Sequence, residues 1–140
     1  MANTKENTAV AAWAALRNMV LNDEAPRKQV SHTLGISYFK VKVILKLLDG
    51  ALSASRLVQD LASEKTYISL ILRDLEADGT IVRQTSPSDR RYKEISLTPA
   101  GCSLAIQAQA ILDQPPDAFC RLLPCALDSL LQLAKKISEP

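Results

Sequence analysis

Residues that commonly build catalytic and metal sites are scarce in this sequence. Its 140 residues include one histidine, His32, and four glycines, with no glycine-rich phosphate loop and no Ser/His/Asp arrangement. The three cysteines, Cys102, Cys120 and Cys125, form no Cys-x-x-Cys pair, so a zinc site would have to gather scattered ligands. We therefore expect no enzyme activity, no metal and no cofactor.

Long apolar runs are missing as well. Residues 9–16 are apolar, but Arg17 ends the run, and Lys5 is offset by Glu6, so the positively charged start of a signal peptide is absent. No run approaches the roughly 20 residues that a membrane-spanning helix needs. The sequence therefore predicts a cytoplasmic protein without a membrane partner, whose thiols stay reduced.

The charge of the chain is small but unevenly distributed. The composition is that of one ordinary globular domain, with 47% hydrophobic and 23% charged residues and a net charge of +2. Residues 27–97 carry twelve Lys and Arg against eight Asp and Glu, whereas the rest of the chain carries five against seven. Basic charge is thus concentrated where a phosphate-facing surface would need it, although a solvated charged face would have the same composition.

Apolar residues at helical spacing predict a mostly helical fold. After a frayed segment 1–7, a first helix is expected from an N-cap at Thr8 to about Asp23. Pro26 and Gly35 are typical of the start and the end of a short second helix. These two helices precede the basic central region.

The central region predicts three helices in succession. The first opens at Ser37, and an extended link at 51–52 leads to the second, which Ser53 caps. After a tight turn, Ser63 is expected to cap the third, residues 64–78. The inward stripe of this third helix is Ile68, Ile71, Leu72 and Leu75.

A hairpin and further helices complete the chain. The β-prone runs 80–85 and 92–97 flank a charged turn and predict two paired strands. Thr98 and Pro99 then open a helix that Pro115 and Pro116 end. A last helix is expected over 124–138, with an apolar stripe at Leu127, Leu130, Leu131, Ala134 and Ile137. The first helix carries a similar stripe at Ala9, Trp13, Leu16 and Val20.

The order helix, extended link, helix, turn, helix and hairpin is that of a winged helix-turn-helix. A helix fits the major groove of duplex DNA, where base edges present distinct patterns of donors and acceptors, and the hairpin reaches the backbone or the minor groove. On the outward face of helix 64–78, the candidate DNA-binding residues are Lys65, Thr66, Tyr67, Ser69 and Arg73. On the wing, they are Arg83, Asp89, Arg90, Arg91 and Lys93.

Several of these segments resemble the multiple-antibiotic-resistance-regulator (MarR) family. The similar segments are Asp89-Arg90-Arg91 with the following 95–101 (Ile-Ser-Leu-Thr-Pro-Ala-Gly), 52–61, 65–69 and 75–79 (Leu-Glu-Ala-Asp-Gly). The sequence resemblance is good over roughly residues 35–104, whereas the flanking helices are similar only in their arrangement along the chain. The Asp-x-Arg wing joined to Leu-Thr-Pro-Ala-Gly is the most specific part.

The resemblance implies a homodimer that binds a pseudo-palindromic operator as a transcription regulator, by family default a ligand-responsive repressor. It implies a DNA-binding lobe at about 36–97 and dimerisation helices at about 8–34 and 98–138. It also implies that Arg91 enters the minor groove, that Asp89 holds it in place, and that Arg90 contacts phosphate.

The resemblance further implies a small aromatic or phenolic ligand between the dimer region and the DNA-binding lobe. The candidate pocket residues are Trp13, Arg17, His32, Tyr38 and Phe39. By residue type, a tryptophan on a helix stripe is more often core, and a lone histidine is more often a surface or a satisfied core residue. Cys102, in the first turn of a helix, is a weak candidate for redox sensing, since all three cysteines are more typical of small buried side chains.

The main alternative is a winged-helix module that binds protein instead of DNA. Such a module would lack a basic wing and a polar face on its third helix. This chain has both, so DNA binding is the favoured interpretation.

Overall fold

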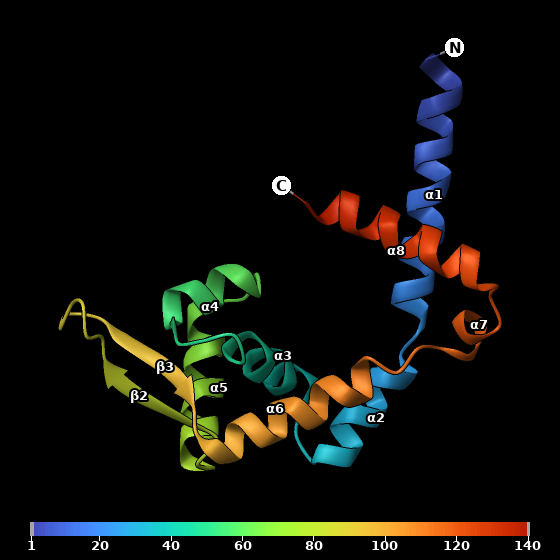
Figure 1. Ribbon diagram of the computed structural model, residues 1–140. Coiled ribbons are helices and arrows are strands. Elements are labelled where there is room, and N and C mark those ends of the chain that lie inside the picture. Colours follow the sequence, from blue (N-terminus) through green and yellow to red (C-terminus); the bar gives the residue numbers. More distant parts are fainter. Residues whose placement is uncertain (1, 140) are drawn as a thin grey trace.

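Eight helices and one three-stranded antiparallel sheet make up residues 2–139, the part of the chain that the computed structural model describes (Figure 1). In chain order the elements are α1 (Ala2–Asn22), α2 (Ala25–Leu34), α3 (Tyr38–Leu47), β1 (Leu52–Ser53), α4 (Ala54–Asp60), α5 (Lys65–Ala77), β2 (Ile81–Thr85), β3 (Lys93–Leu97), α6 (Pro99–Leu112), α7 (Asp117–Cys120) and α8 (Pro124–Ser138). The expected fold class, mostly helical with a small β-hairpin wing, is confirmed.

The main core lies where α3, α4 and α5 pack on the inner face of the sheet. The expected inward stripe of α5 is buried throughout. It packs with side chains that include Ile44 of α3, Leu57 of α4, and Ile81 and Ile95 of the strands, all at most 1% exposed. Burying each such side chain contributes about 1.5–3 kcal/mol, so this core holds α5 and the hairpin in one rigid arrangement.

The three strands pair in the order β1-β3-β2. The hairpin register sets Ile81 opposite Leu97 and Thr85 opposite Lys93, and both strands lie within the two β-prone runs. The extended link at 51–52 was expected only as a connection, but Leu52 pairs with Ile95 and makes β1 a third strand. The far end of the hairpin extends beyond the helices (Figure 1).

The segment that leaves the wing joins three elements. Thr98 Oγ1 accepts a hydrogen bond from the Gly101 amide at 3.0 Å, which caps α6 as expected. The Thr98 amide donates to the Thr80 carbonyl at 3.0 Å, so the end of β3 is tied to the start of β2. A Cβ on Gly101 would overlap this Thr80 carbonyl oxygen, so the residue that follows Ala100 must be glycine.

Two expected helix starts were wrong. Helix α1 begins at Ala2, so Thr8 is interior, and its hydroxyl donates to the Thr4 carbonyl at 2.8 Å, a bond typical of threonine within a helix. The N-cap position of α5 is Glu64 instead of Ser63, and the Glu64 side chain makes no capping hydrogen bond. The reason for the shift is a left-handed Ala62 (φ 47°) in the turn, after which the Ser63 amide donates to the Val58 carbonyl of the preceding helix.

The other helix limits follow the expectations closely. Helix α2 ends at a left-handed Gly35, and the Ser37 and Ser53 hydroxyls cap α3 and α4. Helix α6 ends before Pro115, and α8 spans 124–138 as expected. The short α7 between these two helices was not expected.

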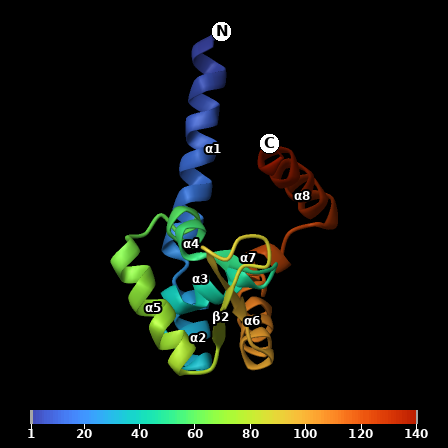
Figure 2. The ribbon, with the colours of Figure 1, turned by 90° about the vertical axis from the view of Figure 1, so that its left-hand side faces the viewer.

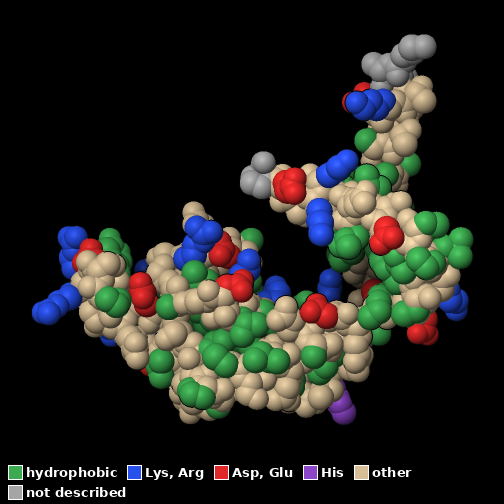
Figure 3. Space-filling model, viewed as in Figure 1, with side chains coloured by type: hydrophobic (Ala, Val, Ile, Leu, Met, Phe, Trp, Pro, Cys, Tyr) green, Lys and Arg blue, Asp and Glu red, His purple; other side chains and the backbone are tan. Residues whose placement is uncertain are grey.

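Helices α1 and α8 extend away from the rest of the molecule (Figures 1 and 2). Among the described residues, neither helix contributes a buried side chain. Large apolar side chains are exposed on both, and Trp13 is 65% and Ile137 is 77% exposed. Figure 3 shows hydrophobic side chains gathered over α7 and the start of α8. No helix within the described residues combines the length and the apolar character that crossing a membrane requires.

Candidate nucleic-acid interface

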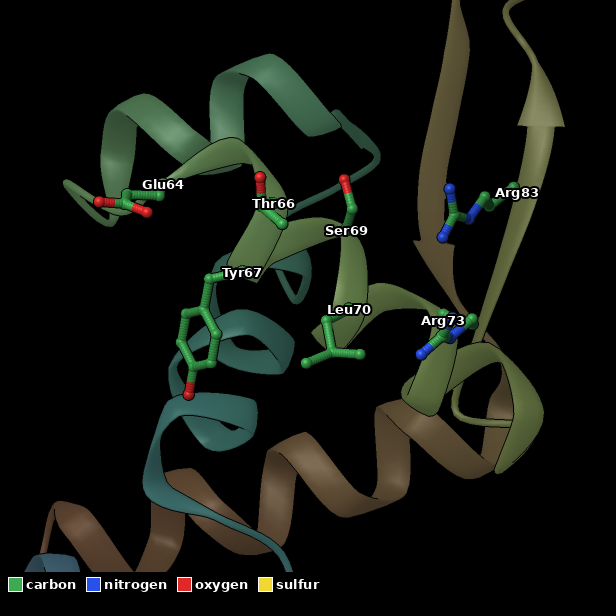
Figure 4. Close-up of a pocket in the computed structure, with 7 residues that line it drawn as sticks. All are labelled: Glu64, Thr66, Tyr67, Ser69, Leu70, Arg73 and Arg83. Carbon is green, nitrogen blue, oxygen red and sulfur yellow. The ribbon is translucent and has the colours of Figure 1, made fainter.

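The outward face of α5 borders a groove of about 630 Å³ between this helix and β2 (Figure 4). Its lining residues are Glu64, Thr66, Tyr67, Ser69, Leu70, Arg73 and Arg83. Four of the five candidate residues of helix 64–78 are therefore together on one surface, and the fifth, Lys65, is exposed at the start of the helix. Sequence reasoning missed Leu70, and the available signal was its position off the inward stripe.

Tyr67 is supported from outside its own helix. Its ring lies against the Phe39 ring of α3, with centroids 4.7 Å apart and planes tilted by 57°. The Lys42 ammonium lies over the other ring of this pair, 4.6 Å from the Phe39 centroid. The packing orients Tyr67 along α3, away from the middle of the groove (Figure 4).

The wing tip holds one arginine in a fixed geometry. Arg91 Nε and Nη2 each donate to a carboxylate oxygen of Asp89 at 3.1 Å, and the Arg91 amide donates to the same carboxylate at 3.0 Å. A backbone hydrogen bond also closes the base of the tip: the Ser86 amide donates to the Tyr92 carbonyl at 2.8 Å. The Arg91 side chain is nevertheless 85% exposed, so it is oriented and still accessible to a ligand.

The same hydrogen bonds favour the ionised form of the Asp89 carboxyl. Side-chain and backbone hydrogen bonds from Arg91 lower the pKa of the Asp89 carboxyl below its ordinary value. A carboxyl with a lowered folded-state pKa stabilises the structure above its unfolded-state pKa, and this contribution is lost as the pH falls through the folded-state value. The Asp89–Arg91 pair therefore persists at neutral and mildly acidic pH.

Ion pairs divide the candidate cations into two groups. Arg83 Nε lies 3.2 Å from Glu76 Oε2 of α5, so this arginine links β2 to the helix and is already partly neutralised. Arg91 is paired with Asp89 as above. Within residues 2–139, the candidates that form no ion pair are Lys65, Arg73, Arg90 and Lys93. These four carry positive charge that is available to phosphates.

The five candidate pocket residues do not surround one cavity. Tyr38 lines two cavities of about 270 and 370 Å³ near α2. The Arg27 Cζ atom lies over the Tyr38 ring, 5.6 Å from the ring centroid. Trp13 and Arg17 are exposed on the projecting α1, and His32 is exposed on α2. Phe39 packs on Tyr67 instead. Within one subunit the structure does not bring these five residues together, because α1 does not fold back onto α3.

The cysteines are more exposed than expected. Cys120 and Cys125 are exposed, in α7 and at the start of α8, and Cys102 is half-buried in α6. The expectation that all three are buried was wrong, because the double proline turns the chain outward before α7.

The helix-turn-helix of α4 and α5, followed by the β2–β3 hairpin, defines a winged helix-turn-helix fold. MarR from E. coli in its apo form is similar, with a TM-score of 0.75 and 20% identity over 90% of this chain and 96% of that one. A variant of MepR from S. aureus, bound to an oligodeoxyribonucleotide, has a TM-score of 0.60 and 21% identity over 89% of this chain and 94% of that one. At these identities the likeness shows the fold, and it is the MarR fold that the sequence motifs suggested.

Comparison with curated sequences gives a narrower likeness. The chain is 36% identical over 87 residues to a Thauera aromatica protein named "Putative transcriptional regulatory protein for hcr operon". The match covers 61% of this chain and 52% of that protein, so it spans about half the length of the relative. No family model matches the chain.

Proposed function

We propose that this protein is a sequence-specific, duplex-DNA-binding transcription regulator of the MarR type. The observation that carries the proposal is the pairing of a polar, unneutralised face on α5 with a wing tip whose exposed Arg91 is oriented by Asp89. The bound oligodeoxyribonucleotide of the S. aureus relative and the name of the Thauera relative support it. A module that binds only protein would have no use for four unpaired cations on these two elements.

In the proposed complex, α5 enters the major groove and the hairpin reaches the minor groove. Thr66, Tyr67 and Ser69 are then near base edges, Lys65 and Arg73 are near phosphates, and Asp89-Arg90-Arg91 lie at the minor groove and its backbone. The lobe at about 36–97 supplies all of these contacts. The segments at about 8–34 and 98–138 are the proposed dimerisation region.

Phosphate contacts predict a steep dependence on salt. If the cations of a dimer neutralise six or more phosphates, log K falls against log salt with a slope of about −5 or steeper, because each contact contributes about −0.9. Fluorescence anisotropy with a labelled duplex, from about 50 to 300 mM salt, measures this slope. Binding that does not change with salt would contradict the phosphate model and favour the protein-binding alternative.

A homodimer is the second part of the proposal. The apolar stripes of α1 and α8 face solvent in a single subunit, so a second copy of the chain is their proposed cover. Light scattering at micromolar concentration is expected to give twice the 15.3 kDa subunit mass. Leu131→Glu puts a charge in this contact and is expected to give monomers, because an unpaired buried charge is costly. Gln132→Glu adds the same charge off the stripe and is expected to remain dimeric; monomeric wild type would refute the dimer.

Repression and a response to a small aromatic or phenolic ligand complete the proposal. Their support is the family resemblance and the two cavities lined by Tyr38, the larger of which is also lined by Met19 and Val20 at the end of α1. Titration of the protein–DNA complex with a panel of phenols and aromatic acids decides whether such a ligand releases DNA. Sequencing of genomic fragments retained by the purified protein identifies the operator.

A further inference from the structure

Leu70 is an exposed aliphatic side chain in the middle of a polar helix face. Its side chain is 44% exposed, whereas Ile68, Ile71, Leu72 and Leu75 of the same helix are at most 5% exposed. A leucine at this position contributes little to the core. Its exposed side chain is therefore free to contact a ligand that binds this face of α5.

The geometry places Leu70 at the centre of the groove. Thr66 lies one turn before it and Arg73 almost one turn after it, and all three line the same groove. Figure 4 shows the leucine side chain projecting from α5 between Tyr67 and Arg73. The Thr66 methyl and the Leu70 isobutyl group thus form a short apolar strip, with the Arg73 guanidinium beyond it.

The major groove of duplex DNA, which such a strip would meet, exposes few apolar groups. In the major groove, the C5-methyl of thymine is the one apolar group that a base edge presents, whereas cytosine presents an N4 donor that a leucine would leave without a partner. We propose that Leu70 is a specificity-determining residue that contacts the C5-methyl group of a thymine in each half-site. This inference rests on the proposed function, because it needs α5 in the major groove.

Deoxyuridine provides an atomic test, because it differs from thymidine only by this methyl group. Once the operator is known, each thymine of a half-site is replaced in turn by deoxyuridine, and Kd is measured at fixed salt. For the wild type, one position per half-site is expected to lose about fourfold in affinity, the factor for burying one methyl group. Leu70→Ala is expected to bind the thymine and uracil duplexes equally at that position.

Two further variants separate the contact from general effects. Leu70→Met keeps an apolar side chain of similar volume and is expected to retain the preference for thymine. Val82→Ala shortens an exposed apolar side chain of β2 outside the groove lining and is expected to keep the full wild-type discrimination. Circular dichroism is expected to show wild-type folding for all three variants.

The outcomes distinguish this inference from the function on which it rests. A wild type that prefers its operator but tolerates uracil at every thymine would overturn the role of Leu70 and leave DNA reading intact. So would a thymine preference that survives in Leu70→Ala. A wild type that binds operator and scrambled duplex equally, or neither, would refute the proposed function and the inference with it.

Discussion

Arg91→Ala is expected to weaken binding to every duplex, and most strongly to operators with A·T-rich flanks. The narrow minor groove of such flanks has an enhanced negative potential that attracts an inserted guanidinium. Loss of charge-assisted hydrogen bonds of this kind costs about 1.5–3 kcal/mol per site. Titration of operator and scrambled duplexes at fixed salt measures the loss.

Two companion variants identify the cause of this loss. Asp89→Ala is expected to give a milder form of the same defect, since the arginine stays but loses the two hydrogen bonds that orient it. Arg121→Ala removes an equal charge from an exposed site outside the lobe and is expected to bind as the wild type does. Unchanged affinity in Arg91→Ala would mean that the wing is only a surface hairpin.

Gly101→Ala is expected to lower the free energy of unfolding by about 3 kcal/mol, the upper part of the range for overpacked sites. The new Cβ would overlap the Thr80 carbonyl oxygen and would also lie 3.2 Å from Leu97 Cδ2. The carbonyl cannot retreat freely, because it accepts the 3.0 Å hydrogen bond from the Thr98 amide. Relief of the overlap must therefore separate the start of α6 from the base of the wing.

Chemical denaturation followed by circular dichroism measures this change. Ser103→Ala, an exposed position half a turn further along α6, is the matched control and is expected to change stability by less than about 0.5 kcal/mol. Gly101→Ala with wild-type stability would show that the two backbones can separate at little cost. DNA affinity is expected to fall with stability, because the same contact sets the angle of the wing.

The local pattern of the sequence was sufficient to predict most elements. The stripe of α5 has one inward face at a period of 3.6 residues, and every position of it is buried. Pro124 determines where α8 begins, since proline is accommodated in the first turn of a helix. The Asp89–Arg91 pair was implied by the family resemblance of a three-residue motif, and it forms within one short segment of the wing tip.

Features that depend on distant segments were not predictable in the same way. Phe39 was a candidate for a ligand pocket, but packing of α3 on α5 sets it against Tyr67. Arg83 was a candidate DNA contact on the wing, and the approach of β2 to α5 pairs it with Glu76. The position of Leu70 off the inward stripe can be read from the sequence, but its place in a groove depends on the packing of β2 beside α5.

Contacts within a few residues set most of the elements, the inward face of α5 and the composition of the wing tip, so these could be predicted from the amino-acid sequence. Packing between distant segments sets which outward side chains share a groove, which cations remain unpaired and which apolar surfaces stay open to solvent. The physical reason is that charge pairing and burial depend on which elements become neighbours in space. Residues such as Arg83 and Glu76 acquire their partners through the packing of the whole lobe.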